Sequence, residues 1–249
     1  MSRDKQEDVK KKETVKIESP QMVPAGMLEA FEHAATLSFE VKSGDGKGEP
    51  ALKEWDVLFN RVESYKGDLP LSFKGEVRMR RAWALMDLDR YEEAEELLAD
   101  DSMGPYLDSF SEEVLYEYFF SFANVLGALG KKALMDEAMR KSLFIATEKL
   151  GDLEKCVRSW MNLMLFAEHN EWWPYLENVS SAAQKFCEEQ GDSLDLLWVL
   201  SGVHKVGALK GQGRMEDAKK VGAKLLKKAQ ALNDEGVTKR VTEVLESIG

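Results

Sequence analysis

The chain has 249 residues, of which 44% are hydrophobic, and its formal net charge at pH 7 is −11. This length supplies ample material for a core, whereas the excess of acids argues against a protein whose whole surface grips nucleic acid, since that needs Lys and Arg facing phosphates. The first twenty residues lack the apolar core of a signal peptide, and no apolar run is long enough to span a bilayer. We therefore expect a cytoplasmic protein without membrane contact.

The composition predicts an all-α protein. Leu, Ala, Glu and Lys dominate, and proline is scarce after Pro24. Long segments with apolar residues at helical spacing alternate with short breaks rich in Gly and Asp. Cys156 and Cys187 each lie inside such a segment, so we expect free buried thiols of a reducing compartment and no disulfide.

The N-terminal part divides into a tail and a hairpin. Residues 1–23 mix Lys, Glu and Asp with little to bury, which predicts a disordered charged tail. Residues 24–70 contain two apolar-periodic segments around a glycine-rich break at 43–48, which predicts an antiparallel helical hairpin. This break follows a helix where a phosphate-binding loop would need a strand, and it lacks the required spacing.

An internal repeat organises the rest of the chain. Residues 91–94 (YEEA), 135–138 (MDEA) and 215–218 (MEDA) each have a large apolar residue, two acids and an alanine. This pattern suits the start of the second helix of a hairpin, because the alanine allows close approach and the acids lie at the positive helix N-terminus. We expect a degenerate copy near Trp172. Stacked hairpins then cover residues 71–235, and residues 236–249 form an amphipathic capping helix.

Residues 71–101 resemble a tetratricopeptide repeat (TPR). The residues that match in order and spacing are Ala82, Leu85, Tyr91, Ala94 and Leu98. The resemblance extends, in degenerate form, over residues 71–230. It implies a superhelical array of antiparallel helical hairpins, a TPR-like α-α solenoid, with units longer than the usual 34 residues.

In this family the first helix of each hairpin lines a concave groove that binds partner proteins. Matching unit against unit places seven large apolar residues there: Met79, Trp83, Met86, Trp160, Met164, Leu200 and Val203. Trp and Met suit the recognition of a partner helix or apolar peptide. The alternative is that they belong to the core, where large apolar residues at helical spacing commonly lie. The clamp of lysines and asparagines with which some relatives hold acidic chaperone tails is absent.

We find no candidate catalytic or metal-ligating residues. The three histidines stand far apart without a second ligand at metal-binding spacing, and motifs such as HExxH and CxxC do not occur. We expect a non-enzymatic adaptor, assembly scaffold or assembly chaperone that needs no cofactor and binds a protein or peptide partner. The alternatives are a small-ligand sensor, nucleic-acid contact through the basic stretch 205–228, and self-association of that stretch with the acidic residues 91–101.

Overall fold

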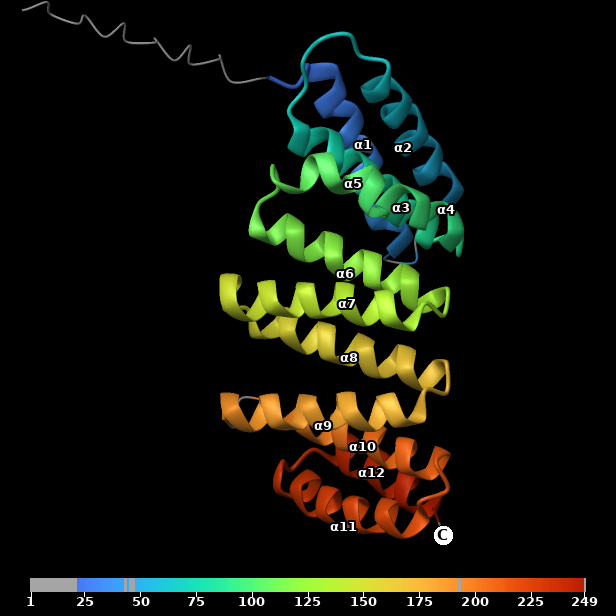
Figure 1. Cartoon of the computed structure of the whole chain (residues 1–249), viewed down its shortest axis with the longest axis vertical. Helices are drawn as coiled ribbons and strands as arrows, with labels where there is room; N and C mark the ends of the chain where they lie inside the picture. Colours follow the sequence, from blue (N-terminus) through green and yellow to red (C-terminus); the bar gives the residue numbers. More distant parts are fainter. Residues whose placement is uncertain (1–21, 43, 45–47, 192–193, 249) are drawn as a thin grey trace, which may run out of the picture.

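The computed structural model describes residues 22–42, 44, 48–191 and 194–248, and within these ranges its regular secondary structure is entirely helical. The helices stack along one long axis, from the N-terminal pair at one end to the C-terminal helices at the other (Figure 1). The predicted all-α solenoid is therefore confirmed. Of the predicted tail, only residues 22 and 23 lie within the described part. None of the helices described combines the length and apolar character needed to cross a membrane.

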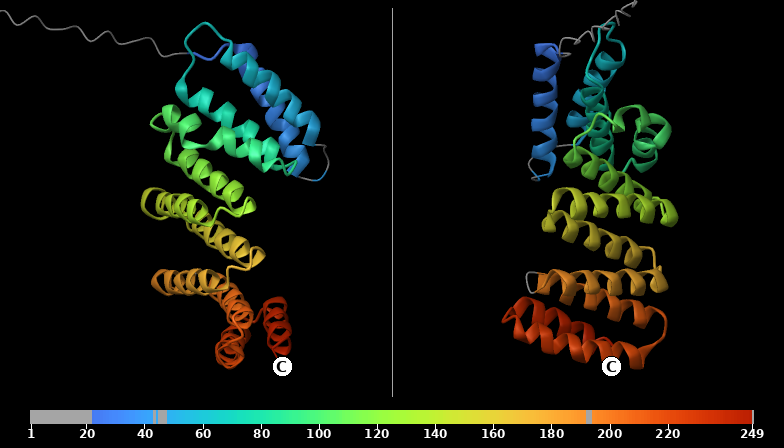
Figure 2. Two further views of the ribbon diagram at one scale, coloured as in Figure 1. Left: turned by 45° about the vertical axis from the view of Figure 1, so that its right-hand side comes forward. Right: turned by 60° about the vertical axis from the view of Figure 1, so that its left-hand side comes forward.

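Hairpins of two antiparallel helices make up the array, and we call their first and second members A and B helices. The A helices are α1 (Ala25–Lys42), α3 (Leu71–Met86), α6 (Glu112–Ala128), α8 (Leu153–His169) and α10 (Asp195–Gly211). The B helices are α2 (Gly48–Glu63), α4 (Tyr91–Leu98), α7 (Lys132–Phe144), α9 (Trp173–Gln190) and α11 (Met215–Ala231). The last helix, α12 (Glu235–Glu246), packs against α10 and α11. Figure 2 shows the layers from two further sides.

The same turn ends four of the A helices. In each turn one residue adopts a left-handed backbone, with φ between 56° and 73°: Asp89, Gly130, Glu171 and Gly213. The following N–H reaches back five residues, as from Arg90 to the Leu85 carbonyl at 3.0 Å, and the left-handed residue's own N–H reaches back three. This pair of bonds is the Schellman motif, which satisfies carbonyls left free at a helix C-terminus. The B helix begins two residues after the left-handed residue.

The turns define the repeat length and correct the predicted alignment. B helices begin at 91, 132, 173 and 215, so successive hairpins are 41, 41 and 42 residues apart. The fourth residue of each B helix is fully buried: Ala94, Met135, Leu176 and Ala218. Met135 therefore matches Ala94 and not Tyr91, and the third copy opens at Trp173 and not Trp172. The prediction was misled because acids and alanine also recur one helical turn later, at Asp136–Ala138.

Two B segments depart from a straight α-helix. At Ala99 the backbone is extended, with ψ of 150°, and this ends α4 after eight residues. A separate helix that the sequence did not predict, α5 (Asp100–Leu107), then turns Met103 fully into the core and contains Pro105. In the next hairpin, α7 passes directly into a π-helical turn, η1 (Ile145–Leu150).

The core is a chain of apolar clusters that each join neighbouring hairpins. One cluster extends from α1 to α6, a second from α6 to α10, and two smaller ones join α10 to α11 and α12. Ala82 and Ala94, which carry the TPR resemblance, are fully buried where α3 meets α4. Both cysteines are free thiols inside the core, as expected. The capping helix begins one residue earlier than predicted, because the Asp234 carboxylate accepts a hydrogen bond from the Val237 N–H.

Candidate functional site

Two adjoining recesses lie on the face formed by the A helices. The first, of about 200 Å³, is lined by residues of α1 and α3 together with Trp55. The second, of about 170 Å³, is lined by Lys42 of α1 and by residues from α3, α6 and α8. Lys42, Trp83 and Asp87 line both recesses. The two therefore form one continuous surface feature, which we call the groove.

Trp83 lies at the centre of the groove between two cations. The Nζ atom of Lys42 is 5.2 Å from its ring centroid, and the guanidinium carbon of Arg80 is 4.4 Å away. Such cations are attracted by the negative face of the indole. Arg80 is also held by Glu76 of the same helix at 3.2 Å. The Trp83 ring is thus fixed in place, while its Nε1–H has no acceptor among the described residues.

An aromatic ring beneath an arginine forms the floor of the second recess. Phe120 is only 3% exposed, and the Arg158 guanidinium lies 4.0 Å from its ring centroid. Glu117 holds Arg158 in this position through an ion pair of 3.0 Å. The groove therefore presents cationic groups that stand on aromatic rings, an arrangement that combines apolar contact with directed hydrogen-bond donors.

Asp87 supplies a carboxylate to both recesses. It follows the last residue of α3, and its partial burial raises the pKa of the carboxyl above the usual range, while the nearby charge of Lys42 opposes this shift. Burial disfavours the charged carboxylate, so a ligand that donates hydrogen bonds to it would relieve part of this cost. Lys42 and Asp87 together provide a donor and an acceptor at the same place.

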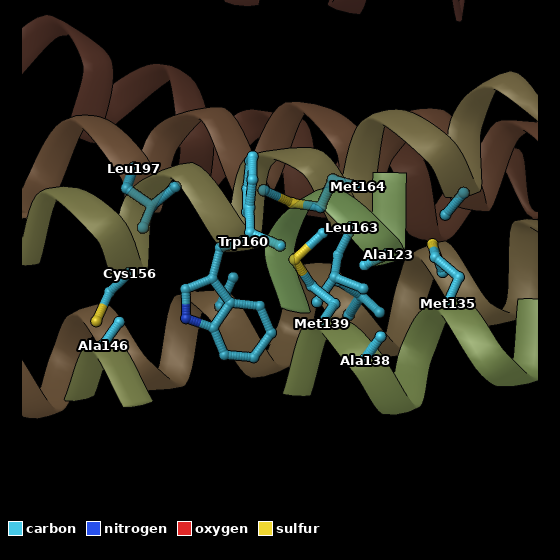
Figure 3. Close-up of a cluster of buried hydrophobic side chains, with 14 of the residues drawn as sticks. Ala123, Met135, Ala138, Met139, Ala146, Cys156, Trp160, Leu163, Met164 and Leu197 are labelled. Atoms are coloured by element: carbon cyan, nitrogen blue, oxygen red, sulfur yellow. The ribbon is translucent and has the colours of Figure 1, made fainter. Parts of the chain in front are cut away.

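The structure divides the seven predicted binding residues into two groups. Trp83 and Met86 line the groove, and Leu200 is half-buried on α10. Met79, Trp160, Met164 and Val203 are core residues instead, with exposures of 1%, 7%, 0% and 8%. Figure 3 shows Trp160 and Met164 inside the central cluster with Leu163 and Met139. The expected groove position of these four residues was wrong; a binding role for the other three stays a prediction.

The error for Trp160 and Met164 arises from the register of the A helices. Counted from the helix starts at 71, 112, 153 and 195, the row of Trp83 continues with Asn124, Leu165 and Gly207. Met164 instead shares its row with Ala82, the small residue that packs against the B helix. Similar residue types in adjacent rows therefore point in different directions.

Sequence reasoning missed several residues of the groove, notably Phe39, Lys42, Phe120 and Arg158. Phe120 and Arg158 come from the next two A helices, but they lie four and seven residues before the row of Trp83, so the 41-residue spacing alone does not indicate them. Phe39 and Lys42 come from α1, which lies outside the recognisable repeats, and no sequence signal places them beside Trp83.

The other arginines and the basic stretch have different surroundings. Arg78 and Arg81 of α3 pair with Glu63 and Asp56 of α2. In the basic stretch, exposed lysines follow one face of α11: Lys220, Lys224 and Lys227. Among the described residues, no three side chains of the metal-binding types come together.

Two crystal structures of nearly identical TPR-like repeats, from a Podosopora anserina protein described as a kinesin light chain, are similar to this chain. They match with TM-scores of 0.62 and 0.60 at 14% and 15% sequence identity. The matches cover 85% and 86% of this chain and 100% of each of those chains. No protein-family model matches the chain. No curated protein matches it either. The likeness confirms the TPR-like fold.

Proposed function

We propose that this TPR-like array is a non-enzymatic protein-interaction module of the cytoplasm, an adaptor or assembly scaffold, whose groove binds a helix or an extended peptide of a partner protein. The observation that supports this proposal most is the continuous groove around Trp83, with its aromatic floor and its cations. Two free buried thiols fit a reducing compartment.

The dimensions of the groove favour a peptide over a cofactor. Each recess, at about 170 Å³ and 200 Å³, is smaller than the roughly 300–1,000 Å³ typical of small-molecule sites. A recess of this size accepts a single side chain. Two such recesses that meet at Trp83 suit successive anchor residues on one helix face or on an extended strand.

The side chains of the groove have the chemistry of binding hot spots. Trp and Arg are the residue types that contribute most when they are desolvated at the centre of an interface. Phe39, which is 72% exposed at the rim, adds apolar surface that a partner would cover. Lys42 can orient the partner by donating hydrogen bonds to it, and Asp87 by accepting them, beside the apolar contact.

The proposal is tested by affinity capture with the full chain, followed by titration of the captured protein and of overlapping peptides from it. Trp83→Ala should raise the dissociation constant about 30-fold, which corresponds to roughly 2 kcal/mol. Tyr65→Ala is the matched control, because Tyr65 is also an exposed aromatic residue but does not line the groove. A partner that binds Trp83→Ala as tightly as the wild type, with both variants folded, would contradict the proposal.

A further inference from the structure

The last helix, α12, takes the place of an A helix at the C-terminal end of the array (Figure 1). The helices α3, α6, α8, α10 and α12 begin at 71, 112, 153, 195 and 235, so the intervals are 41, 41, 42 and 40 residues. The last of them packs against α10 and α11 as α10 packs against α8 and α9. Its apolar residues Val237 and Ile248 stand in the rows of Leu197 and Ala208 of α10. Position and register therefore identify α12 as a further A helix.

The face that an A helix turns toward its own B helix is polar in α12. In the row that packs against the B helix, the four preceding A helices bury an apolar residue: Ala82, Ala123, Met164 and Val206. The next member of this row is Glu246, which is exposed. Thr242 and Glu243 likewise take the places of Gly202 and Val203, which pack against Leu225 of α11. No B helix follows α12 among the described residues, so this face lies uncovered there.

A recess of about 680 Å³ lies along this face of α12. The α12 residues that line it include those at 235, 239, 242 and 246, which follow one side of the helix over nearly its whole length. All of its lining residues are polar, whereas small-molecule sites are lined mainly by apolar side chains. A second helix lying along α12 would cover all four positions at once. The recess therefore suits a helix better than a small molecule.

The charges in the recess favour a basic partner. Its lining contains one base, Lys239, and four acids: Asp234, Glu235, Glu243 and Glu246. Asp234 caps the helix, and Glu243 lies 3.9 Å from Lys239, but Glu235 and Glu246 have no ion pair among the described residues. A helix that only covers the end of a repeat array needs polar residues of either sign. The excess of acids goes beyond that need and complements a positively charged surface.

We propose that α12 binds a helix of a partner protein that is rich in lysine or arginine, and that this helix takes the place of a B helix. B helices run antiparallel to A helices, so the N-terminus of the bound helix lies near Glu246, whose charge suits the positive end of the helix dipole. The basic residues near its C-terminus then lie beside Glu235. None of the residues of this recess lines the groove, so the inference stands apart from the proposed function.

Titration of the full chain with a designed peptide tests the proposal. The peptide is an alanine-based helix of 17 residues, the length of α11, with lysines at helical spacing along one face. Its dissociation constant, measured by fluorescence anisotropy at low salt, should rise at least about tenfold in the Glu243→Lys/Glu246→Lys variant. The control is Glu92→Lys/Glu96→Lys, which makes the same charge change at two exposed acids of α4.

The control variant should bind the peptide as tightly as the wild type does, because α4 lies outside the recess. Circular dichroism checks that both variants keep the helical content of the wild type. If the two variants weaken binding equally, the peptide responds to net charge alone and the proposal is overturned. A wild-type chain that does not bind the peptide overturns it as well.

Cross-linking gives an independent readout of the orientation. The natural cysteines, Cys156 and Cys187, are buried, so a thiol introduced on α12 is the accessible one. Under mild oxidation, a peptide with a C-terminal cysteine should link to Glu235→Cys and not to Glu246→Cys, since about 16 Å of helix separates the two positions. A peptide with an N-terminal cysteine should show the opposite preference. Equal linking at both positions, or the reverse pattern, would refute the B-helix arrangement.

Discussion

The two halves of the A-helix face differ although they share one backbone repeat. In the N-terminal half, Trp83 and Asn124 occupy equivalent positions and line an open groove. In the C-terminal half the same row continues with Leu165 and Gly207. There α8 and α10 are in contact: the Nδ1 atom of His204 on α10, a residue only 2% exposed, lies 2.9 Å from Glu168 on α8.

This difference shows that the turns control the register of the helices, whereas the side chains control how closely neighbouring A helices pack. The Schellman turns fix the register of each hairpin, whatever residue stands in a given row. The volumes of the side chains in that row then decide whether adjacent A helices leave a recess or meet. The binding surface therefore depends on which side chains stand in the row of Trp83. The fold depends instead on the row of A-helix residues that faces the B helices.

The two tryptophans give the largest contrast. Trp160 lies inside the central core, whereas Trp83 is partly exposed in the groove. Trp160→Ala should lower the free energy of unfolding by about 3–5 kcal/mol, because it removes a buried ring and leaves a cavity. Trp83→Ala should cost less than half as much. Urea unfolding followed by circular dichroism measures both changes, and equal losses would place the two rings in equivalent surroundings.

The left-handed position of each A-helix turn, such as Gly130 or Glu171, should favour glycine over a residue with a side chain. Gly130→Ala adds a Cβ at a residue with φ of 70° and should lower the free energy of unfolding by about 1 kcal/mol. Glu171→Gly, at φ of 56°, relieves the same strain but makes the unfolded chain more flexible, so a smaller gain of about 0.5 kcal/mol is expected. Thermal unfolding should show shifts of opposite sign. Shifts of the same sign would mean that the left-handed backbone is not the controlling factor.

The smallest effect concerns the contact between α8 and α10. His204, whose Nδ1 atom lies 2.9 Å from the Glu168 carboxylate, lowers the pKa of Glu168 below its ordinary value of about 4.5, against the opposing effect of partial burial. A lowered pKa stabilises the fold above the ordinary value, and this contribution is lost as the pH falls through the lowered one. The Glu168→Gln variant should therefore be less stable than the wild type at pH 7, by under about 1 kcal/mol, and nearly equal at pH 3. Chemical unfolding at both pH values checks this.

Glu117→Gln is the matched control for that measurement. It removes the ion pair between α6 and α8 in the other half of the face, where Glu117 holds Arg158 at 3.0 Å. Comparing the two variants separates the contact between α8 and α10 from the general effect of deleting a carboxylate that pairs with a neighbouring A helix. A stability difference for Glu168→Gln that does not change with pH would contradict the assigned role of His204.

The sequence predicted the helical hairpins because their signals are local. Ala82 and Ala94 mark a close helix contact, and Gly130 and Gly213 mark turns that need a left-handed residue. Asp89 and Glu171 adopt the same turn without a glycine, so the regular 41-residue spacing was not apparent. The unpredicted helix α5 follows from an extended residue at Ala99, where neither Gly nor Pro signals a break.

The site was less predictable than the fold because it depends on packing between distant segments. Trp83 could be proposed from its helix alone, but the recess beside it needs Phe39 and Lys42 from α1. Trp160 looked equivalent to Trp83 by residue type, and only the register of the A helices separates them. A side chain that points one row away from the groove has the same local sequence signal as one that lines it.

The regular spacing of the turns also has a mechanical consequence. Packing joins each hairpin mainly to its neighbours along the axis, so the array is a series of units that each stabilise only the adjacent ones. If the two ends are pulled apart, hairpins can detach one after another from an end while the remainder stays folded. Each detached unit of 41 residues would release about 140 Å of extended chain, so the length per step would be nearly uniform along the rod.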